Sequence, residues 1–333
     1  MILSGLYCLA IGFRNLCYKV GVFKTFKLYA KVISVGNITW GGTGKTSFVS
    51  FLAKNLAQKN QKIAILIRGY KRKGKGMVIL ENGIEDVDWR RVGDEAYLLG
   101  SSLGSVPVII EKDRVKSGKY AIDKYSAKYL VLDDGFQYRR LSKNINIIML
   151  DAQDPFGNKM LIPAGKLREP LANIKMADIV VLNNSKLAKD KKQLLGELRK
   201  YNPTAPIIET EQVVESICDL NEEHPIQLNE IKDKKILAFC GIGNPESFRA
   251  TVRDLGVDIL DFVVFPDHYV YKNKDIQLIV KKALDKKADF ILTTQKDKIR
   301  LTASRNFEIP IYFVRIDTRI IRGQEDLWKM IYE

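Results

Sequence analysis

A glycine-rich segment near the N-terminus has the residue types, in the right order, to hold a nucleotide phosphate. The apolar run 32–36 leads into a loop that ends in Gly-Thr-Gly-Lys-Thr and continues into a helix-forming stretch. Backbone N–H groups of such a loop surround a phosphate at the helix N-terminus, the lysine reaches the β/γ oxygens and the threonine hydroxyl ligates Mg²⁺. We therefore predict a P-loop that binds ATP and Mg²⁺, with nucleotide contacts from Thr39, Trp40, Gly41, Gly42, Thr43, Gly44, Lys45, Thr46 and Ser47.

The loop departs from the standard P-loop pattern, and its differences from two other P-loop classes, partitioning-type ATPases and GTPases, help to identify the nucleotide. The strict pattern begins with a glycine where this chain has Thr39, although the end of the loop and its flanking strand and helix are complete. Trp40 stands where partitioning-type ATPases have their signature lysine, and no N-K-x-D motif for reading guanine follows. These features favour ATP over GTP; the alternative is a chance glycine turn before a helix.

Two adjacent carboxylates, Asp133 and Asp134, end an apolar run that we expect to be a strand. In a parallel sheet that strand end lies on the same edge as the P-loop, where an aspartate can hold Mg²⁺ directly or through water. The alternative is a solvated turn, because Gly135 follows. With Thr46, the two aspartates are the predicted metal residues.

Short apolar runs alternate with helical stretches along most of the chain. This rhythm is typical of an α/β fold, here a P-loop NTPase-like parallel sheet flanked by helices. A second alternation after Asn202-Pro203 predicts a smaller α/β C-terminal domain. The predicted division is an N-terminal helix at 1–31, a kinase core at 32–203 and the smaller domain at 204–333.

The first 31 residues combine an apolar run with cations. The run from Ile2 to Phe13 is too short to span a bilayer, which takes about 20 residues. Apolar residues recur at helical spacing, and basic residues follow them, which is typical of an amphipathic helix at a membrane interface. A helix packed on the protein's own core is an equal alternative. The predicted apolar face comprises Leu3, Leu6, Tyr7, Ala10, Phe13, Leu16 and Cys17.

Composition indicates a globular protein with an anionic partner. There are 54 Lys plus Arg against 39 Asp plus Glu, a net charge of +15, which suits nucleic acid, a phosphorylated substrate or an anionic membrane. The four cysteines have neither zinc-site nor disulfide spacing, which fits a reducing cytoplasm. A nucleic-acid-binding ATPase and a membrane-associated switch therefore remain alternatives, although no recognisable nucleic-acid module is present.

An ordered series of motifs resembles the tetraacyldisaccharide 4'-kinase family. The resemblance spans nearly the whole chain, and this family also lacks the first P-loop glycine. Ser47 is a departure, since the family often has proline there. The matching segments are 32–46 (VISVGNITWGGTGKT), 92–95 (VGDE), 131–137 (VLDDGFQ), 162–170 (IPAGKLREP), 241–248 (GIGNPESF), 265–269 (FPDHY) and 294–297 (TQKD).

The resemblance implies an α/β kinase that moves the γ-phosphate of ATP to the 4'-hydroxyl of an acylated glucosamine disaccharide 1-phosphate. The product is the bisphosphate precursor of lipid A. It also implies dependence on Mg²⁺ and a peripheral or monotopic place on the cytoplasmic face of the bacterial inner membrane. We expect no nucleic-acid partner and no obligate protein partner.

The resemblance also implies roles for individual residues. Lys45 serves catalysis, Asp94 accepts the proton of the sugar hydroxyl, and His268 is the partner of that base. The residues around Asp94, taken without the resemblance, favour a helix N-cap over a catalytic base, and a lone histidine is more often structural than catalytic. The predicted contacts to substrate and its phosphates are Asn37, Arg114, Gln137, Asn158, Arg168 and Glu169.

Overall fold

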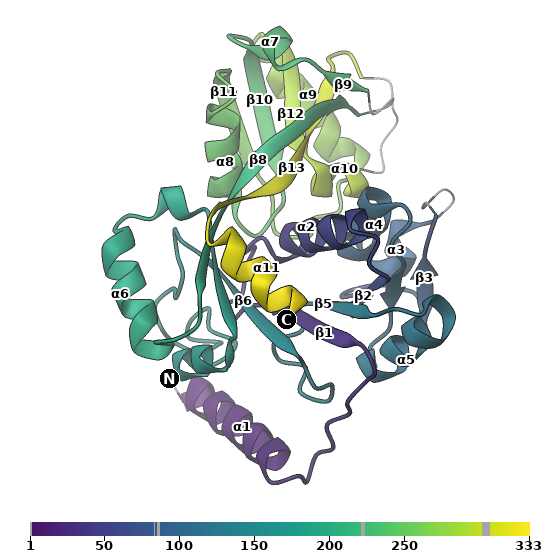
Figure 1. The fold of residues 1–333 in the computed structure, drawn as a ribbon. Coiled ribbons are helices and arrows are strands. Elements are labelled where there is room, and N and C mark those ends of the chain that lie inside the picture. The colour runs from purple at the N-terminus through teal and green to yellow at the C-terminus, as the bar shows by residue number, and fades with distance from the viewer. Residues whose placement is uncertain (1, 83, 85–86, 221–223, 302–306) are drawn as a thin grey trace. The chain divides into compact units, whose positions relative to one another are not determined.

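The computed structural model describes residues 2–82, 84, 87–220, 224–301 and 307–333 (Figure 1). The chain forms two compact units, one of residues 1–211 with 318–333 and the other of residues 212–317. This partition differs from the predicted division in returning the C-terminal segment to the first unit. Two long strands, β8 (Ile207–Asp219) and β13 (Ile311–Arg322), each run from one unit into the other.

The first unit is built on a largely parallel sheet, as predicted. Its inner strands are continuous apolar runs because both faces of the sheet are covered. From β8 to β3, neighbouring strands of this sheet are parallel except for β3, which is antiparallel to β4. The strand order is β8, β7 (Ile179–Asn183), β6 (Ile145–Asp151), β1 (Lys31–Gly36), β5 (Tyr129–Asp133), β2 (Ile63–Ile67), β4 (Val108–Ile110) and β3 (Val78–Leu80).

Helices cover both faces of this sheet because alternate strand residues point to opposite sides. Apolar side chains of α2 (Lys45–Gln58), α4 (Asp94–Leu103) and α11 (Gln324–Tyr332) share one core with the sheet. Those of α5 (Arg114–Tyr125), α6 (Lys191–Tyr201) and the 3₁₀ helix η1 (Leu171–Met176) pack on the other face. Short helices α3 (Trp89–Val92) and η2 (Ser185–Leu187) lie in connections.

The second unit contains parallel strands in the order β11 (Asp258–Val264), β10 (Lys235–Cys240), β12 (Phe290–Thr294) and β13, and the same sheet continues from β13 to β8. Its helices are α7 (Leu228–Ile231), α8 (Pro245–Arg253), α9 (Asn273–Asp285) and α10 (Gln295–Arg300). The short strand β9 (Pro225–Ile226) pairs antiparallel with β8. Apolar side chains on both faces of this sheet form two core clusters.

Helix α1 (Ile2–Lys19) docks on the first unit through polar contacts. The Tyr7 hydroxyl donates to the Arg168 carbonyl at 3.1 Å, and Arg14 pairs with Glu169 at 2.6 Å. Ile11 and Cys17 are buried, and the Tyr7 hydroxyl bonds to the protein, so Tyr7 and Cys17 of the predicted apolar face lie on the side that contacts the protein.

The outward face of α1 is apolar nonetheless. Leu6 is 58% exposed, Leu9 71% and Phe13 68%, with Leu3 and Leu16 also exposed. The helix therefore packs on the protein through one side and presents leucine and phenylalanine to solvent on the other. Among the described helices, none is both long and apolar enough to cross a bilayer.

Candidate active site

The glycine-rich loop connects the end of β1 to the start of α2, which is the strand, loop and helix order predicted. Gly41 and Gly44 have φ of +123° and +84°, in the left-handed region that a side chain disfavours. The loop is held by a neighbouring segment. The Trp40 N–H donates to the Lys166 carbonyl and the Arg168 N–H donates to the Ile38 carbonyl, both at 2.6 Å.

Asn37 is a buried organiser of this loop. Its amide nitrogen donates to the Thr43 hydroxyl at 3.2 Å, and its side-chain oxygen accepts from the Arg168 guanidinium at 3.1 Å. Its carbonyl accepts from the Gln137 amide at 2.8 Å. Asn37, Gln137 and Arg168 are thus brought together beside the loop.

Asp133 reaches the P-loop from the neighbouring strand. It pairs in register with Val35, so the ends of β5 and β1 meet at one edge of the sheet. The Thr46 hydroxyl donates to Asp133 Oδ2 at 3.2 Å, and both residues are buried. A hydroxyl beside a carboxylate offers hard oxygen ligands, and Mg²⁺ at phosphate sites takes one or two protein oxygens together with water and phosphate. This donor pair fits Mg²⁺.

Asp134 has different partners from Asp133. Its carboxylate accepts two hydrogen bonds from the Arg168 guanidinium, at 2.9 and 3.1 Å, and lies 3.8 Å from the Lys45 ammonium. Burial by itself raises the pKa of Asp134, but the charges of Lys45 and then Arg168 outweigh it and hold the pKa at about 2. Asp134 is therefore an anion that pairs with two cations beside the loop, Lys45 and Arg168.

Asp94 is the first residue of α4, and the N-cap position belongs to Gly93. Its side chain is buried, and Oδ1 accepts from the Glu95 N–H at 2.9 Å. Helix α4 packs in the same core as α2, which carries Lys45. Asp94 is thus a buried carboxylate in the first turn, and the N-cap alternative does not describe its position.

The remaining predicted substrate residues have separate surroundings. Arg114 is buried over the Tyr138 ring at 4.7 Å, and its pKa is lowered mainly by burial, while Asp133 and Asp134 act against that lowering. Buried Glu169 accepts from Arg14 and from Asn173, so it anchors α1. Asn158 is exposed, and its described hydrogen bonds stay within its own loop.

His268 lies in the second unit, in a loop held by a buried network. Its φ is +62°, and its N–H donates to the Gly241 carbonyl at 3.2 Å. Asp297 accepts from the Gly241 N–H at 3.0 Å and from the Tyr271 hydroxyl at 2.8 Å. The motifs around residues 241, 268 and 297 therefore converge on one loop, and the network includes Arg300, which donates to the Gly241 carbonyl at 2.8 Å.

Sequence reasoning missed several members of these networks. Tyr138 accepts from the Arg114 N–H at 3.1 Å and donates to Asp113 at 3.1 Å, so it helps position a predicted phosphate-binding arginine. Tyr271 and Arg300 support the loop of His268 in the same way. Tyr138, Tyr271 and Arg300 each lie within three residues of a family motif, and this position in the sequence could have identified them as candidates.

Comparisons with known proteins point to a single kinase family. The family described as tetraacyldisaccharide-1-P 4'-kinase (LpxK) matches residues 1–333. The tetraacyldisaccharide 4'-kinase of Aquifex aeolicus is 38% identical, over 99% of this chain and 96% of the relative. That of Syntrophus aciditrophicus is 35% identical, over 96% of this chain and 88% of the relative.

A solved structure supports the same conclusion. A crystal structure of LpxK from Aquifex aeolicus in complex with ATP matches with a TM-score of 0.77 and 34% sequence identity, covering 99% of this chain and 96% of that one. The predicted α/β fold is confirmed, as is the resemblance drawn from the motif series. The chain belongs to the tetraacyldisaccharide 4'-kinase family.

Proposed function

We propose that this protein transfers the γ-phosphate of ATP to the 4'-hydroxyl of a tetraacyldisaccharide 1-phosphate, giving the bisphosphate precursor of lipid A. The observation that carries the proposal is the meeting of the P-loop with Asp133 at one sheet edge, in a chain that matches this kinase family throughout. The nucleic-acid-binding ATPase and the non-catalytic switch are not favoured.

Residues of the loop and of the adjacent segments bind different parts of the Mg-ATP complex in this proposal. The loop N–H groups would surround the phosphates, and Lys45, whose ammonium lies 3.8 Å from Asp134, would contact the β/γ oxygens. Thr46 and Asp133 would hold Mg²⁺, which neutralises charge on the transferring phosphate. Asp134 is the weaker candidate for direct metal contact because Arg168 occupies both its oxygens.

Asp94 is the proposed base. A sugar hydroxyl is a weak nucleophile, so a carboxylate that orients it and accepts its proton speeds the transfer. Burial in the first turn of α4 fixes the Asp94 carboxylate rather than leaving it mobile in solvent. We propose His268 as the group that tunes this base, and Arg114 and Arg168 as contacts for substrate or phosphate.

The outward face of α1 is the proposed contact with the membrane. Leu6, Leu9 and Phe13 are more than half exposed, and a lipid surface would cover them. Basic residues at the end of the helix and just after it add attraction to an anionic leaflet. This arrangement suits a peripheral enzyme on the cytoplasmic face of the inner membrane, where an acylated substrate is embedded.

The decisive experiment incubates the protein with Mg-ATP and tetraacyldisaccharide 1-phosphate and follows the lipid by mass spectrometry. A kinase adds one phosphate to the lipid, and label from γ-³²P-ATP appears in it. Lys45→Ala is the matched control for contaminating kinases. ATP hydrolysis without phosphate in the lipid would reject the proposal and favour a switch.

A further inference from the structure

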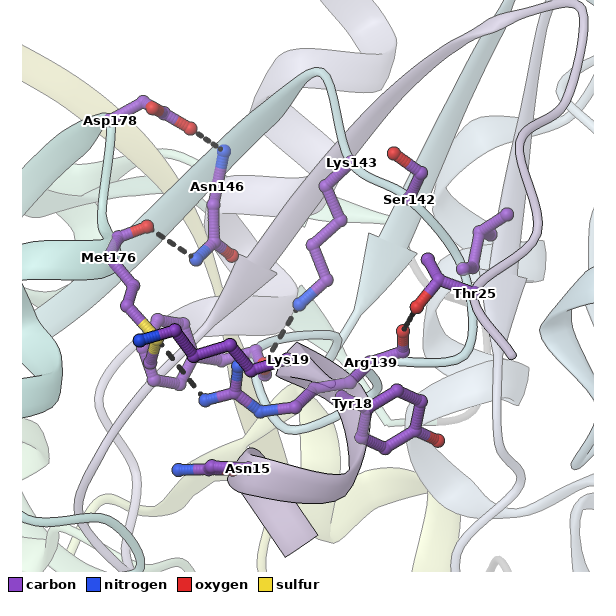
Figure 2. A pocket seen from close by; sticks show the side chains of 12 residues that line it. Asn15, Tyr18, Lys19, Thr25, Arg139, Ser142, Lys143, Asn146, Met176 and Asp178 are labelled. Carbon is purple, nitrogen blue, oxygen red and sulfur yellow. Dashed lines mark hydrogen bonds between the residues drawn. The ribbon is translucent and has the colours of Figure 1, made fainter. Parts of the chain in front are cut away.

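A cavity of about 380 Å³ lies beneath the C-terminal half of α1, and none of the predicted nucleotide-binding residues lines it. Figure 2 shows the lining side chains, which include Asn15, Tyr18 and Lys19 from α1 and Arg139 and Lys143 from the β5–β6 connection. Its volume is in the range of small-ligand sites, roughly 300–1,000 Å³. The cavity is therefore large enough for a headgroup-sized ligand.

Arg139 brings a guanidinium with spare hydrogen-bonding capacity to this cavity. One of its terminal nitrogens donates to the Met176 sulfur at 3.2 Å, and a thioether is a weak acceptor. Its Nε is buried and has no hydrogen-bond partner among the described residues. A buried donor without an acceptor is costly unless a ligand supplies the acceptor.

Lys143 is the second cation. Its ammonium donates to the Phe136 carbonyl at 2.8 Å, which uses one of three protons, and it forms no ion pair with a described carboxylate. Burial, followed by the positive charge of Arg139, lowers the pKa of Lys143 to about 7. With a pKa of about 7, Lys143 is only partly protonated near neutral pH, and an anion between it and Arg139 would favour its charged form.

Glu169 acts on Arg139 and Lys143 through its charge and raises the pKa of both, but neither cation is hydrogen-bonded to it among the described contacts. Glu169 is committed to Arg14 and Asn173, at 2.6 and 2.7 Å. Asp178, which also lines the cavity, accepts from the Asn146 backbone N–H at 2.8 Å. With Lys19 also lining the cavity, its lining carries more positive than negative charge.

The surface beside the cavity is apolar. Val20 is 63% exposed, Val22 67% and Phe23 43%, and these residues lie between Lys19 and Thr25, which both line the cavity. A ligand with its charged group inside and an acyl chain outside would cover them. Free phosphate would leave this apolar surface exposed to water.

We propose that this cavity is a second anion site, separate from the P-loop, which takes the phosphate monoester headgroup of a lipid. Arg139 and Lys143 donate to the phosphate oxygens, and the acyl chains lie along Val20, Val22 and Phe23. The inference goes beyond the proposed phosphate transfer, because it needs neither ATP nor turnover.

The test is calorimetric titration of the full chain, saturated with ADP, with dihexanoyl phosphatidate below its micellar concentration. Lys143→Met and Arg139→Met should each weaken binding about tenfold or more, since each removes charge-assisted hydrogen bonds. Lys175→Met is the matched control: Lys175 is exposed on η1 next to Met176 but does not line the cavity. Lys45→Ala should bind phosphatidate as wild type does.

Parallel titrations with inorganic phosphate and dihexanoyl phosphatidylcholine separate the possible sources of the anion. Phosphatidate should bind most tightly. Equal binding of inorganic phosphate, a loss that follows Lys45→Ala, or unchanged binding by both cavity variants would overturn the proposal.

A measurement on the wild-type protein guards against variants that do not fold. Lysines carrying ¹³C-methyl groups report their own titration by NMR. Phosphatidate should shift the Lys143 signal and raise its pKa from about 7, because an anion beside an ammonium favours the charged form. A Lys143 signal that phosphatidate leaves unmoved would contradict the site.

Discussion

Arg168 links Asn37 of the P-loop to Asp134, and its removal should lower the free energy of unfolding by an amount that depends on pH. The Asp134 carboxylate has a pKa of about 2 instead of 3.8, chiefly because Lys45 and Arg168 offset its burial. A difference of this size corresponds to about 2.4 kcal/mol of stability. The Asp134 side chain is 37% exposed, so solvent screening reduces this to about 1–2 kcal/mol.

Arg168 supplies only part of this effect, because Lys45 also lowers the pKa of Asp134. Arg168→Ala should therefore lower the free energy of unfolding at pH 7 by about 1 kcal/mol through this pair. A carboxylate whose pKa is lower in the folded than in the unfolded protein stabilises the fold at pH values above its unfolded-state pKa. This stabilisation is lost as the pH falls through its folded-state pKa. The difference between wild type and Arg168→Ala should thus be constant above about pH 5 and shrink between pH 3.8 and about 2.

The assay is urea unfolding across this pH range, followed by a probe in the first unit. Arg168→Lys should recover only part of the loss, because an ammonium cannot make the bidentate pair. Arg91→Ala, at an exposed arginine of the same unit, is the control. A stability difference for Arg168→Ala that stays the same down to pH 2 would refute the electrostatic argument and indicate lost packing instead.

Three further results are expected. Lys45→Ala and Asp133→Ala should each abolish phosphate transfer while circular dichroism stays that of wild type; near-normal turnover by either would reject the site. Asp94→Ala should lower turnover by about 10²–10⁴-fold with ATP binding nearly unchanged, and a melted protein with intact specific activity would argue for a structural role instead. Asp at both Leu6 and Phe13, which are 58% and 68% exposed, should reduce sedimentation with anionic vesicles and leave the melting temperature unchanged; unaltered sedimentation would contradict the membrane contact.

Much of the fold could be predicted because its signals are local. A buried parallel strand is a short apolar run, and the glycine loop before α2 needs backbone angles that glycine provides. The place of Asp133 beside the P-loop also followed from sequence, since carboxyl ends of parallel strands share an edge. The motif series then predicted the family, because seven ordered segments are more specific than one loop.

Other features depend on contacts between segments far apart in the chain. The different partners of Asp133 and Asp134 come from Thr46 and Arg168, and no spacing rule predicts that pairing. Likewise, the Tyr7 side chain points toward the protein because its hydroxyl bonds to the Arg168 carbonyl, which lies far away in the sequence.

The sequence by itself determined the α/β class, the nucleotide loop and the amphipathic character of the first helix, because backbone preference and hydrophobic periodicity act over a few residues. Only the tertiary structure decided which side of α1 faces solvent, which aspartate is held by arginine, and that Arg139 and Lys143 share a cavity. Charge pairing and burial depend on distances in space, and these are set by packing of segments that are remote in sequence.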